Sequence, residues 1–222
     1  MIKWYYEDQA KTQVDTVIAA CTCENGVSAV QFAESLFYPQ GGGQKGDRGV
    51  FVLEGVEYVI VKTVKDEGFN SVCLVEGELP ADCVGKAVSC RLDAAYRDRQ
   101  TRLHSCLHVY HMIAEQVLGA ELQYPTLSTI EAGFAVNKYN GEAMTDEVLE
   151  VATARFLEFI KTDTPARTFA DAEDPNRRYW QCGECVIPCG GTHVARMDAI
   201  GAVTVATKRK KGQISVQISL AE

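Results

Sequence analysis

The chain has 222 residues, an apolar fraction of 46% and a formal net charge of −8 at pH 7. This length allows one large domain or two modest ones, and the negative charge excludes unspecific binding to polyanions, so any nucleic-acid contact must be local. There is no apolar run of about 18 residues for a membrane span and no signal peptide, and nine cysteines without a disulfide-scaffold spacing predict free thiols in the reducing cytoplasm.

The first 88 residues are expected to form a small all-β domain, a barrel or a sandwich. Short apolar or alternating runs separated by turns are typical of strands, and Asn25-Gly26 is typical of a tight hairpin turn. The expected strands are Lys3–Tyr6, Val14–Cys21, Val27–Phe32, Gly49–Leu53, Val56–Val64, Val72–Val75 and, where the pattern changes, Val88–Leu92.

A glycine-rich loop, FYPQGGGQKGDRG, interrupts these strands at Phe37–Gly49. Five glycines in thirteen residues lose much entropy on ordering, which favours a sharp bend or a closely approaching ligand. A long flexible hairpin explains the composition equally well. The loop matches neither a Walker phosphate loop nor a dinucleotide-binding fingerprint, because the final Lys-Ser/Thr and a following helix are missing.

Residues 89–222 are expected to form an α+β domain with helices packed on an antiparallel sheet. Apolar residues at helical spacing predict a helix from Ala94 to Leu118, with Asp93 as its N-cap and Gly119 as its C-cap. The remaining expected elements are a strand at Phe134–Tyr139, a helix capped by Thr145 and ending near Ile160 with a buried stripe of Val148, Ala152, Phe156 and Ile160, a strand at Pro165–Phe169, a short helix or turn at Asp174–Trp180, and strands at Ala202–Ala206 and Ile214–Leu220.

Two pairs of potential metal ligands stand in this second part. His104 and His108 are four apart in the predicted helix and therefore share one face, and Cys189 and His193 stand in a glycine-rich turn. Each pair alone is a weak signal, but together they make a His/His/Cys/His set that suits zinc. A metalloprotease is disfavoured because Ser105 replaces the glutamate that would act as general base. A cytidine deaminase is disfavoured because no His-x-Glu motif is present.

Two alternatives remain open from the residues alone. Cys182 and Cys185 form a CxxC motif that, with Cys189, could bind its own zinc or act in redox chemistry, although a second half-site is available only from the two helix histidines. His111 follows on the same side of the helix, either as a packed residue or as a hydrogen-bonding residue near the metal.

Three motifs in a fixed order carry a resemblance to a known family. They are FYPQGGGQKGDRG at Phe37–Gly49, RLHSCLH at Arg102–His108 and CGGTHV at Cys189–Val194. Over nearly the whole chain, they resemble the editing domain of alanyl-tRNA synthetase and the free-standing AlaX trans-editing proteins. The resemblance implies an N-terminal β-barrel domain over residues 1–88. It also implies a two-layer α+β editing domain over residues 89–222, like the second additional domain of the threonyl- and alanyl-tRNA synthetases.

The resemblance also implies the site residues. One zinc ion per chain would be held by His104, His108, Cys189 and His193, and substrate would contact Gly41, Gly42, Gly43, Gln44, Asp47, Ser105 and Thr192. The backbone of Gly41–Gln44 would approach the terminal adenosine or the aminoacyl group, whereas Asp47 has a turn residue as its commoner role. The family often has Thr and Ala after the first His, where this chain has Ser105 and Cys106, which leaves the amino-acid selectivity open.

The implied activity is hydrolysis of tRNA(Ala) that carries serine, with glycine as a second candidate. Zinc can lower the pKa of a bound water and polarise the ester carbonyl, so no certain catalytic side chain is named. The chain ends at Glu222 without an aminoacylation domain, so we expect a medium-length AlaX protein that acts in trans and needs no ATP. The candidate RNA-binding residues are Lys208, Arg209, Lys210, Lys211, Arg97 and Arg99. The alternatives are a non-catalytic tRNA-binding module with a structural zinc, and a zinc hydrolase that acts on a small ester.

Overall fold

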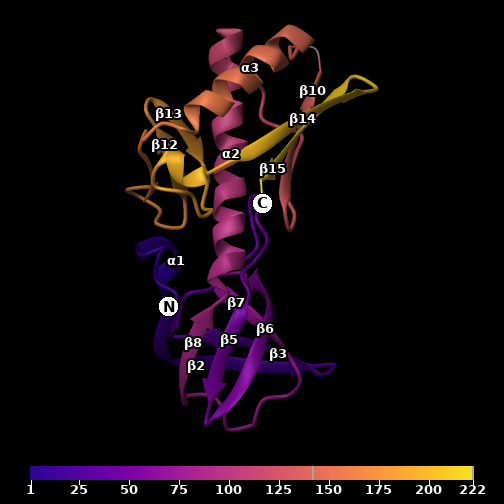
Figure 1. The fold of residues 1–222 in the computed structure, drawn as a ribbon. Helices are drawn as coiled ribbons and strands as arrows, with labels where there is room; N and C mark the ends of the chain where they lie inside the picture. Colours follow the sequence, from indigo (N-terminus) through magenta and orange to yellow (C-terminus); the bar gives the residue numbers. More distant parts are fainter. Residues whose placement is uncertain (142, 222) are drawn as a thin grey trace. The chain divides into compact units, whose positions relative to one another are not determined.

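The computed structural model describes residues 1–141 and 143–221 (Figure 1). These residues fold into two compact units. Unit 1 consists of Met1–Gly41 and Lys45–Asp98, and unit 2 consists of Gly42–Gln44 together with the chain from Arg99 onward. The predicted fold class, a small β-barrel followed by an α+β domain, is confirmed. Within the described ranges, no helix is both long and apolar enough to cross a membrane.

Unit 1 is a closed six-stranded barrel with the strand order β2-β3-β7-β6-β5-β8. Its strands are β2 (Gln13–Glu24), β3 (Val27–Phe32), β5 (Gly49–Leu53), β6 (Val56–Lys65), β7 (Ser71–Glu76) and β8 (Ala87–Leu92). Alternation along each strand turns one set of side chains inward, and Val30, Phe32 and Phe51 are among those buried in the barrel core. Asn25 and Gly26 both have positive φ, as the predicted β2–β3 turn requires.

Two details of unit 1 differ from the expected elements. The predicted strand at Lys3–Tyr6 is wrong: only β1 (Ile2–Lys3) is extended, paired with β4 (Glu34–Ser35), and α1 (Trp4–Glu7) follows it. The helical turn buries the Tyr5 side chain and lets the Trp4 indole donate a hydrogen bond to the Glu34 carboxylate. In addition, β8 crosses the expected domain boundary after residue 88 and pairs with both β2 and β5, so the whole strand lies in unit 1.

Unit 2 combines two antiparallel sheets with helices. The larger sheet has the order β14-β15-β10-β9 and the smaller one the order β11-β12-β13, and the β14–β15 hairpin lies beside β10 (Figure 1). The strands are β9 (Leu127–Ile130), β10 (Phe134–Asn140), β11 (Ala166–Ala170), β12 (Arg178–Cys182), β13 (Cys185–Pro188), β14 (Val203–Lys210) and β15 (Gln213–Leu220), and a short 3-10 helix, η1, covers Met197–Ile200. The core of the unit centres on the side chains of Tyr110, Phe156, Trp180, Met197 and Val216.

The long helix α2 (Ala94–Leu118) begins and ends where its capping residues predict. The Tyr96 amide donates to the Asp93 carboxylate at 2.9 Å, and Gly119 adopts a φ of +65° directly after the helix. This helix carries three of the four histidines of the chain at one-turn spacing.

The second helix, α3 (Asp146–Phe159), begins as predicted, because the Thr145 hydroxyl accepts from the Val148 amide at 3.2 Å. Its buried stripe contains Leu149 in place of the expected Val148, which is half-buried. The predicted helix or turn at 174–180 is a turn that leads into β12, and β9 and β13 were not predicted because each is only four residues long.

Candidate metal centre

The structure brings the four predicted ligands together. One ligand atom from each of His104, His108, Cys189 and His193 lies within 4.8 Å of all the others. The two histidines of α2 stand one turn apart, and the other two residues stand in the loop that follows β13. The CGG turn can come this close because Gly191 has no side chain: a Cβ atom there would overlap the His104 ring.

The spacing of these atoms fits a single zinc-sized ion. The Cys189 Sγ atom lies 3.6 Å from Nε2 of His104 and 3.4 Å from Nε2 of His193. In a tetrahedral site, Zn–S bonds of about 2.3 Å and Zn–N bonds of about 2.0 Å place sulfur and nitrogen roughly 3.6 Å apart. Thiolate and imidazole are also the donor types that zinc prefers in proteins.

Gln44 of the glycine-rich loop sets the orientation of His104. The Gln44 Oε1 atom accepts from the Thr192 amide at 3.0 Å, and its Nε2 atom donates to the Thr192 hydroxyl at 2.9 Å. These two bonds identify which end of the carboxamide is oxygen. The same oxygen lies 2.9 Å from His104 Nδ1, so that nitrogen carries the proton and donates. The Nε2 lone pair of His104 is therefore free and faces the Cys189 sulfur.

Ser105 performs the same task for His193. Its hydroxyl donates to the Thr101 carbonyl at 2.9 Å and accepts from the Val194 amide at 3.0 Å. With its proton used, the oxygen can only accept from His193 Nδ1, which lies 3.3 Å away. Ser105 is fully buried, so its hydroxyl supports a ligand and is not exposed for substrate.

Burial keeps the ligand histidines neutral at pH 7. Desolvation lowers the pKa of His104 to about 4, and it lowers the pKa values of His108 and His193 well below the ordinary value, with mutual repulsion of the rings adding to the effect. Neutral imidazole is the form that binds a metal. The Nδ1 atom of His108 is buried without a hydrogen-bond partner in the part of the chain that the structure describes, as suits an atom awaiting an ion or a water.

We expect the metal-free protein to lose stability as the pH falls from about 6.5 to about 4. The unfolded chain binds a proton at His104 near pH 6.5, whereas the folded chain does so only near pH 4, so this stability is complete above the first value and lost towards the second. The pKa difference corresponds to about 3 kcal/mol. Urea unfolding of the metal-free protein at a series of pH values measures it. His104→Gln should make the profile shallower, because His108 and His193 keep their own lowered pKa values, and a flat wild-type profile would contradict the lowered pKa of His104.

Replacing Gln44 with leucine is expected to lower the zinc affinity by about 10- to 100-fold. The change removes the acceptor that fixes His104, and lost partners of metal ligands have effects of that size. Competition with a chelator gives the affinity, and unfolding of the metal-free protein reports whether the fold is kept. Gln44→Glu keeps the acceptor oxygen and serves as the control, with a smaller effect expected. Unchanged zinc binding in a folded Gln44→Leu variant would show that Gln44 does not position the ligand.

A hollow of about 240 Å³ opens beside the metal set within unit 2. Its lining includes His104, His108 and Gly42, together with apolar side chains such as Leu107 and Ile187. Gly43, beside it, adopts a φ of +82°, and a Cβ atom there would meet the Ser128 carbonyl at 2.7 Å, so the loop backbone can pass this closely only as glycine. The metal set and the hollow together form a site that can polarise and enclose a small group.

Three polar lining residues of this hollow were not predicted from the sequence. Tyr124, Ser128 and Asn137 lie in or next to the short strands β9 and β10. The Asn137 side chain donates to the Leu107 carbonyl at 3.1 Å and accepts from the Ser128 hydroxyl at 2.7 Å. The one signal that the sequence offered was Asn137, a polar residue at an inward position of an alternating strand. A buried polar group of this kind needs hydrogen-bond partners.

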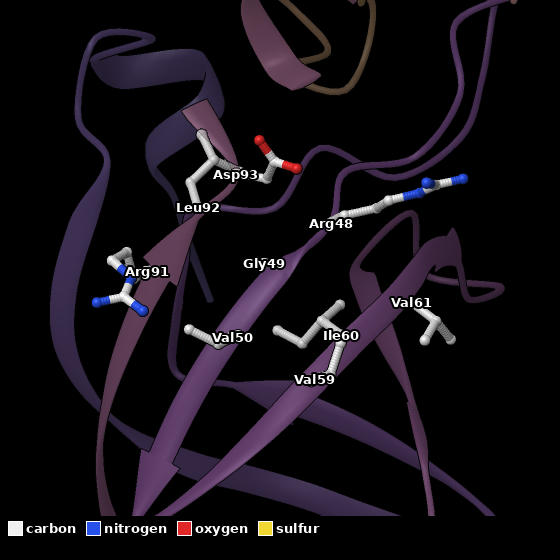
Figure 2. A pocket seen from close by; sticks show the side chains of 9 residues that line it. All are labelled: Arg48, Gly49, Val50, Val59, Ile60, Val61, Arg91, Leu92 and Asp93. Atoms are coloured by element: carbon white, nitrogen blue, oxygen red, sulfur yellow. The ribbon is translucent and has the colours of Figure 1, made fainter. Parts of the chain in front are cut away.

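Unit 1 contains a larger hollow, of about 600 Å³, lined by residues of β5, β6 and β8 and of the segments beside them. Figure 2 shows Arg91 and Arg48 on either side of the apolar residues Val50 and Ile60. The Arg48 guanidinium lies 4.7 Å from the centre of the Tyr96 ring, and Arg91 pairs with Glu57. Both cations are thus engaged within unit 1, and this hollow carries none of the four metal ligands.

Comparison with known proteins shows which family this chain belongs to. No family model matches the chain. The alanyl-tRNA editing protein AlaX-M of Pyrococcus horikoshii is 31% identical over 210 residues, which cover 90% of this chain and 88% of that protein. The chain belongs to the AlaX family of alanyl-tRNA editing proteins. AlaX-L of the same organism is 26% identical over 94% of this chain and 55% of its own length. The alanine–tRNA ligase of Chromohalobacter salexigens is 32% identical over 78% of this chain but only 22% of the ligase.

In this AlaX chain, Asp47 is a buried structural residue of unit 1. Its carboxylate accepts from the Tyr38 amide at 2.5 Å and from Nε and Nη2 of the Arg97 guanidinium, whose Nη2 also donates to the Leu36 carbonyl at 2.8 Å. Burial raises the pKa of the Asp47 carboxyl, and the Arg97 charge opposes that rise. Asp47 thus joins Tyr38 to Arg97, and its side chain has no exposed surface.

The candidate RNA-binding residues of this AlaX chain fall into two groups. Arg97 is 5% exposed and engaged by Asp47, and Arg209 donates to the carbonyls of Gly141 and Met144 at 3.1 and 2.6 Å. Lys208, Lys210, Lys211 and Arg99 are exposed, and Arg209 is exposed as well but pairs with Asp146. Thr192, a candidate for substrate contact, is fully buried and bonded to Gln44.

Proposed function

We propose that this AlaX-family chain is a zinc-dependent aminoacyl-tRNA deacylase that cleaves the ester of tRNA(Ala) carrying serine, with glycine as a second substrate. The observation that carries the proposal is the set of four zinc-type ligands at the edge of a hollow of about 240 Å³. The family assignment supports tRNA(Ala) as the nucleic acid, since its members are named for alanyl-tRNA editing. Such a substrate would place the protein in the cytoplasm.

His104, His108, Cys189 and His193 would hold the ion, which when bound supplies Lewis-acid chemistry for ester hydrolysis. The protein's own residues orient the ligands and shape the space. Gln44 and Ser105 fix the imidazole rings with Nε2 directed inward, as their hydrogen bonds indicate. The apolar wall of the hollow excludes water from the reacting ester and strengthens polar interactions there.

Selection of serine over alanine needs a polar contact for the extra hydroxyl group. A site built to hydrogen-bond a substrate hydroxyl discriminates far better than an apolar pocket does. Ser128 is suited to this task, because it lines the hollow and its hydroxyl, which donates to Asn137, can still accept a hydrogen bond.

Hydrolysis of seryl-tRNA(Ala), with alanyl-tRNA(Ala) beside it and zinc content assayed on the same sample, tests this proposal. Fast loss of serine with alanine spared, at about one zinc per chain, is the expected result. A folded and zinc-loaded protein that cleaves neither ester would overturn it.

A non-catalytic tRNA-binding module with a structural zinc is the second candidate. Four protein ligands favour it, because catalytic zinc sites usually keep one position open. This candidate predicts that chelation unfolds unit 2 and that no ester is cleaved. The same hydrolysis assay, repeated after chelation and followed by circular dichroism, separates the two functions.

A further inference from the structure

An exposed aromatic side chain stands at the rim of the candidate site. Tyr124 lines the same hollow as His104 and His108, yet 61% of its surface is exposed. It lies between α2 and β9, outside every strand and helix. An exposed aromatic ring beside a polar site can bind a flat partner by stacking.

Tyr124 is the outermost ring of a stack of three. Its ring lies 5.3 Å from that of His111 at an angle of 21°, and the His111 ring lies parallel to that of Tyr139 at 5.9 Å. Tyr139 is buried, and its hydroxyl accepts from Asn137 at 3.0 Å, which anchors the stack in the core. His111 stacks against one face of Tyr124, so a flat partner would stack on the other face. The stack holds a flat apolar surface in a fixed orientation.

Tyr124 also lines a second hollow, of about 530 Å³, so the two hollows share this ring. The hollow with the metal set, at about 240 Å³, is smaller than the roughly 300–1,000 Å³ of most small-molecule sites. It is sized for the aminoacyl ester, which leaves the attached base outside. The second hollow carries the carboxamides of Gln123 and Asn140, both exposed, which can pair with the hydrogen-bonding edge of a base.

We propose that Tyr124, backed by His111 and Tyr139, is the stacking platform for the terminal adenine of the acylated tRNA. This inference rests on the proposed function, since it uses the metal set to place the ester. Single-stranded RNA bases bind proteins by stacking on aromatic rings, and adenosine is the terminal nucleoside of every tRNA. The charge is suitable too: Glu121 is the only charged residue among the described lining of the second hollow, which fits a neutral base better than a phosphate.

A tRNA(Ala) ending in 2-aminopurine in place of its terminal adenine tests the platform directly. Fluorescence of this base is quenched when it stacks on an aromatic ring. We expect the zinc-loaded wild-type chain and Tyr124→Phe to quench it alike, and Tyr124→Leu to lose the quenching. We also expect Tyr124→Leu to raise KM for seryl-tRNA(Ala) by about 5- to 150-fold with kcat nearly unchanged, because one stacked base contributes that much binding.

Controls keep the outcomes distinct. Tyr124 is exposed, so Tyr124→Leu should fold, which a thermal unfolding midpoint checks, and Tyr179→Leu changes a tyrosine that lines neither hollow. Quenching that survives in Tyr124→Leu, or that is lost in Tyr124→Phe, overturns the platform. A wild-type chain that hydrolyses seryl-tRNA(Ala) without quenching overturns this inference alone. Quenching without hydrolysis leaves the platform standing and overturns the proposed activity.

Discussion

Cys189→Ala is expected to lower the zinc affinity by about two to three orders of magnitude and to abolish deacylation at ordinary zinc concentrations. The sulfur lies within 4.8 Å of three histidine ligand atoms and contributes the one thiolate of the set. Four-ligand zinc sites bind with about 10–16 kcal/mol in total, so the loss of one ligand removes roughly 3 kcal/mol. Metal content, affinity from chelator competition and hydrolysis of seryl-tRNA(Ala) are measured on one preparation.

Cys185→Ala is the matched control for this variant. Cys185 lies in the neighbouring strand β13 and outside the ligand set, so its replacement should leave zinc content and hydrolysis near the wild-type level. The reverse pattern, with zinc lost in Cys185→Ala and kept in Cys189→Ala, would show that the CxxC motif binds the metal instead. Equal retention of zinc in both variants would mean that the ion is held elsewhere.

Arg97→Met is expected to lower the free energy of unfolding by about 3–5 kcal/mol. The change leaves the Asp47 carboxylate, which has no exposed surface, without its counter-charge. The glycine-rich loop is held through this carboxylate and the Tyr38 amide, so its order depends on the pair. Urea unfolding followed by circular dichroism measures the change.

Arg91→Met provides the comparison, because Arg91 pairs with Glu57 at the exposed surface of the same barrel. Its loss should cost about 0–1 kcal/mol. Replacing both members of the buried pair, Arg97→Met with Asp47→Leu, should recover much of the stability, since no isolated charge remains buried. A single Arg97→Met variant as stable as Arg91→Met would contradict the structural role assigned to the pair.

Local sequence patterns determined the parts of the fold that depend on neighbours along the chain. The bounds of α2 follow from helical spacing together with Asp93 and Gly119 as caps, and the β2–β3 turn follows from Asn25-Gly26. Short elements were missed or misassigned, because four residues carry too little periodicity. The helical turn of α1 and the strands β9 and β13 are such cases, each stabilised by contacts with distant residues.

The sequence by itself pointed to the four residues whose ligand atoms the structure brings within 4.8 Å of one another, because spacing within each pair and the chemistry of the side chains are local properties. Tertiary structure alone decided which residues far apart in the sequence meet. Gln44 meets His104 and Thr192 across 60 and 148 residues of sequence, and Asp47 meets Arg97 across 50. Tyr124 became a candidate only when the fold placed it beside the ligands. A lone glutamine, arginine or tyrosine has no periodic signature in the sequence. Tertiary packing determines its partner and therefore its role.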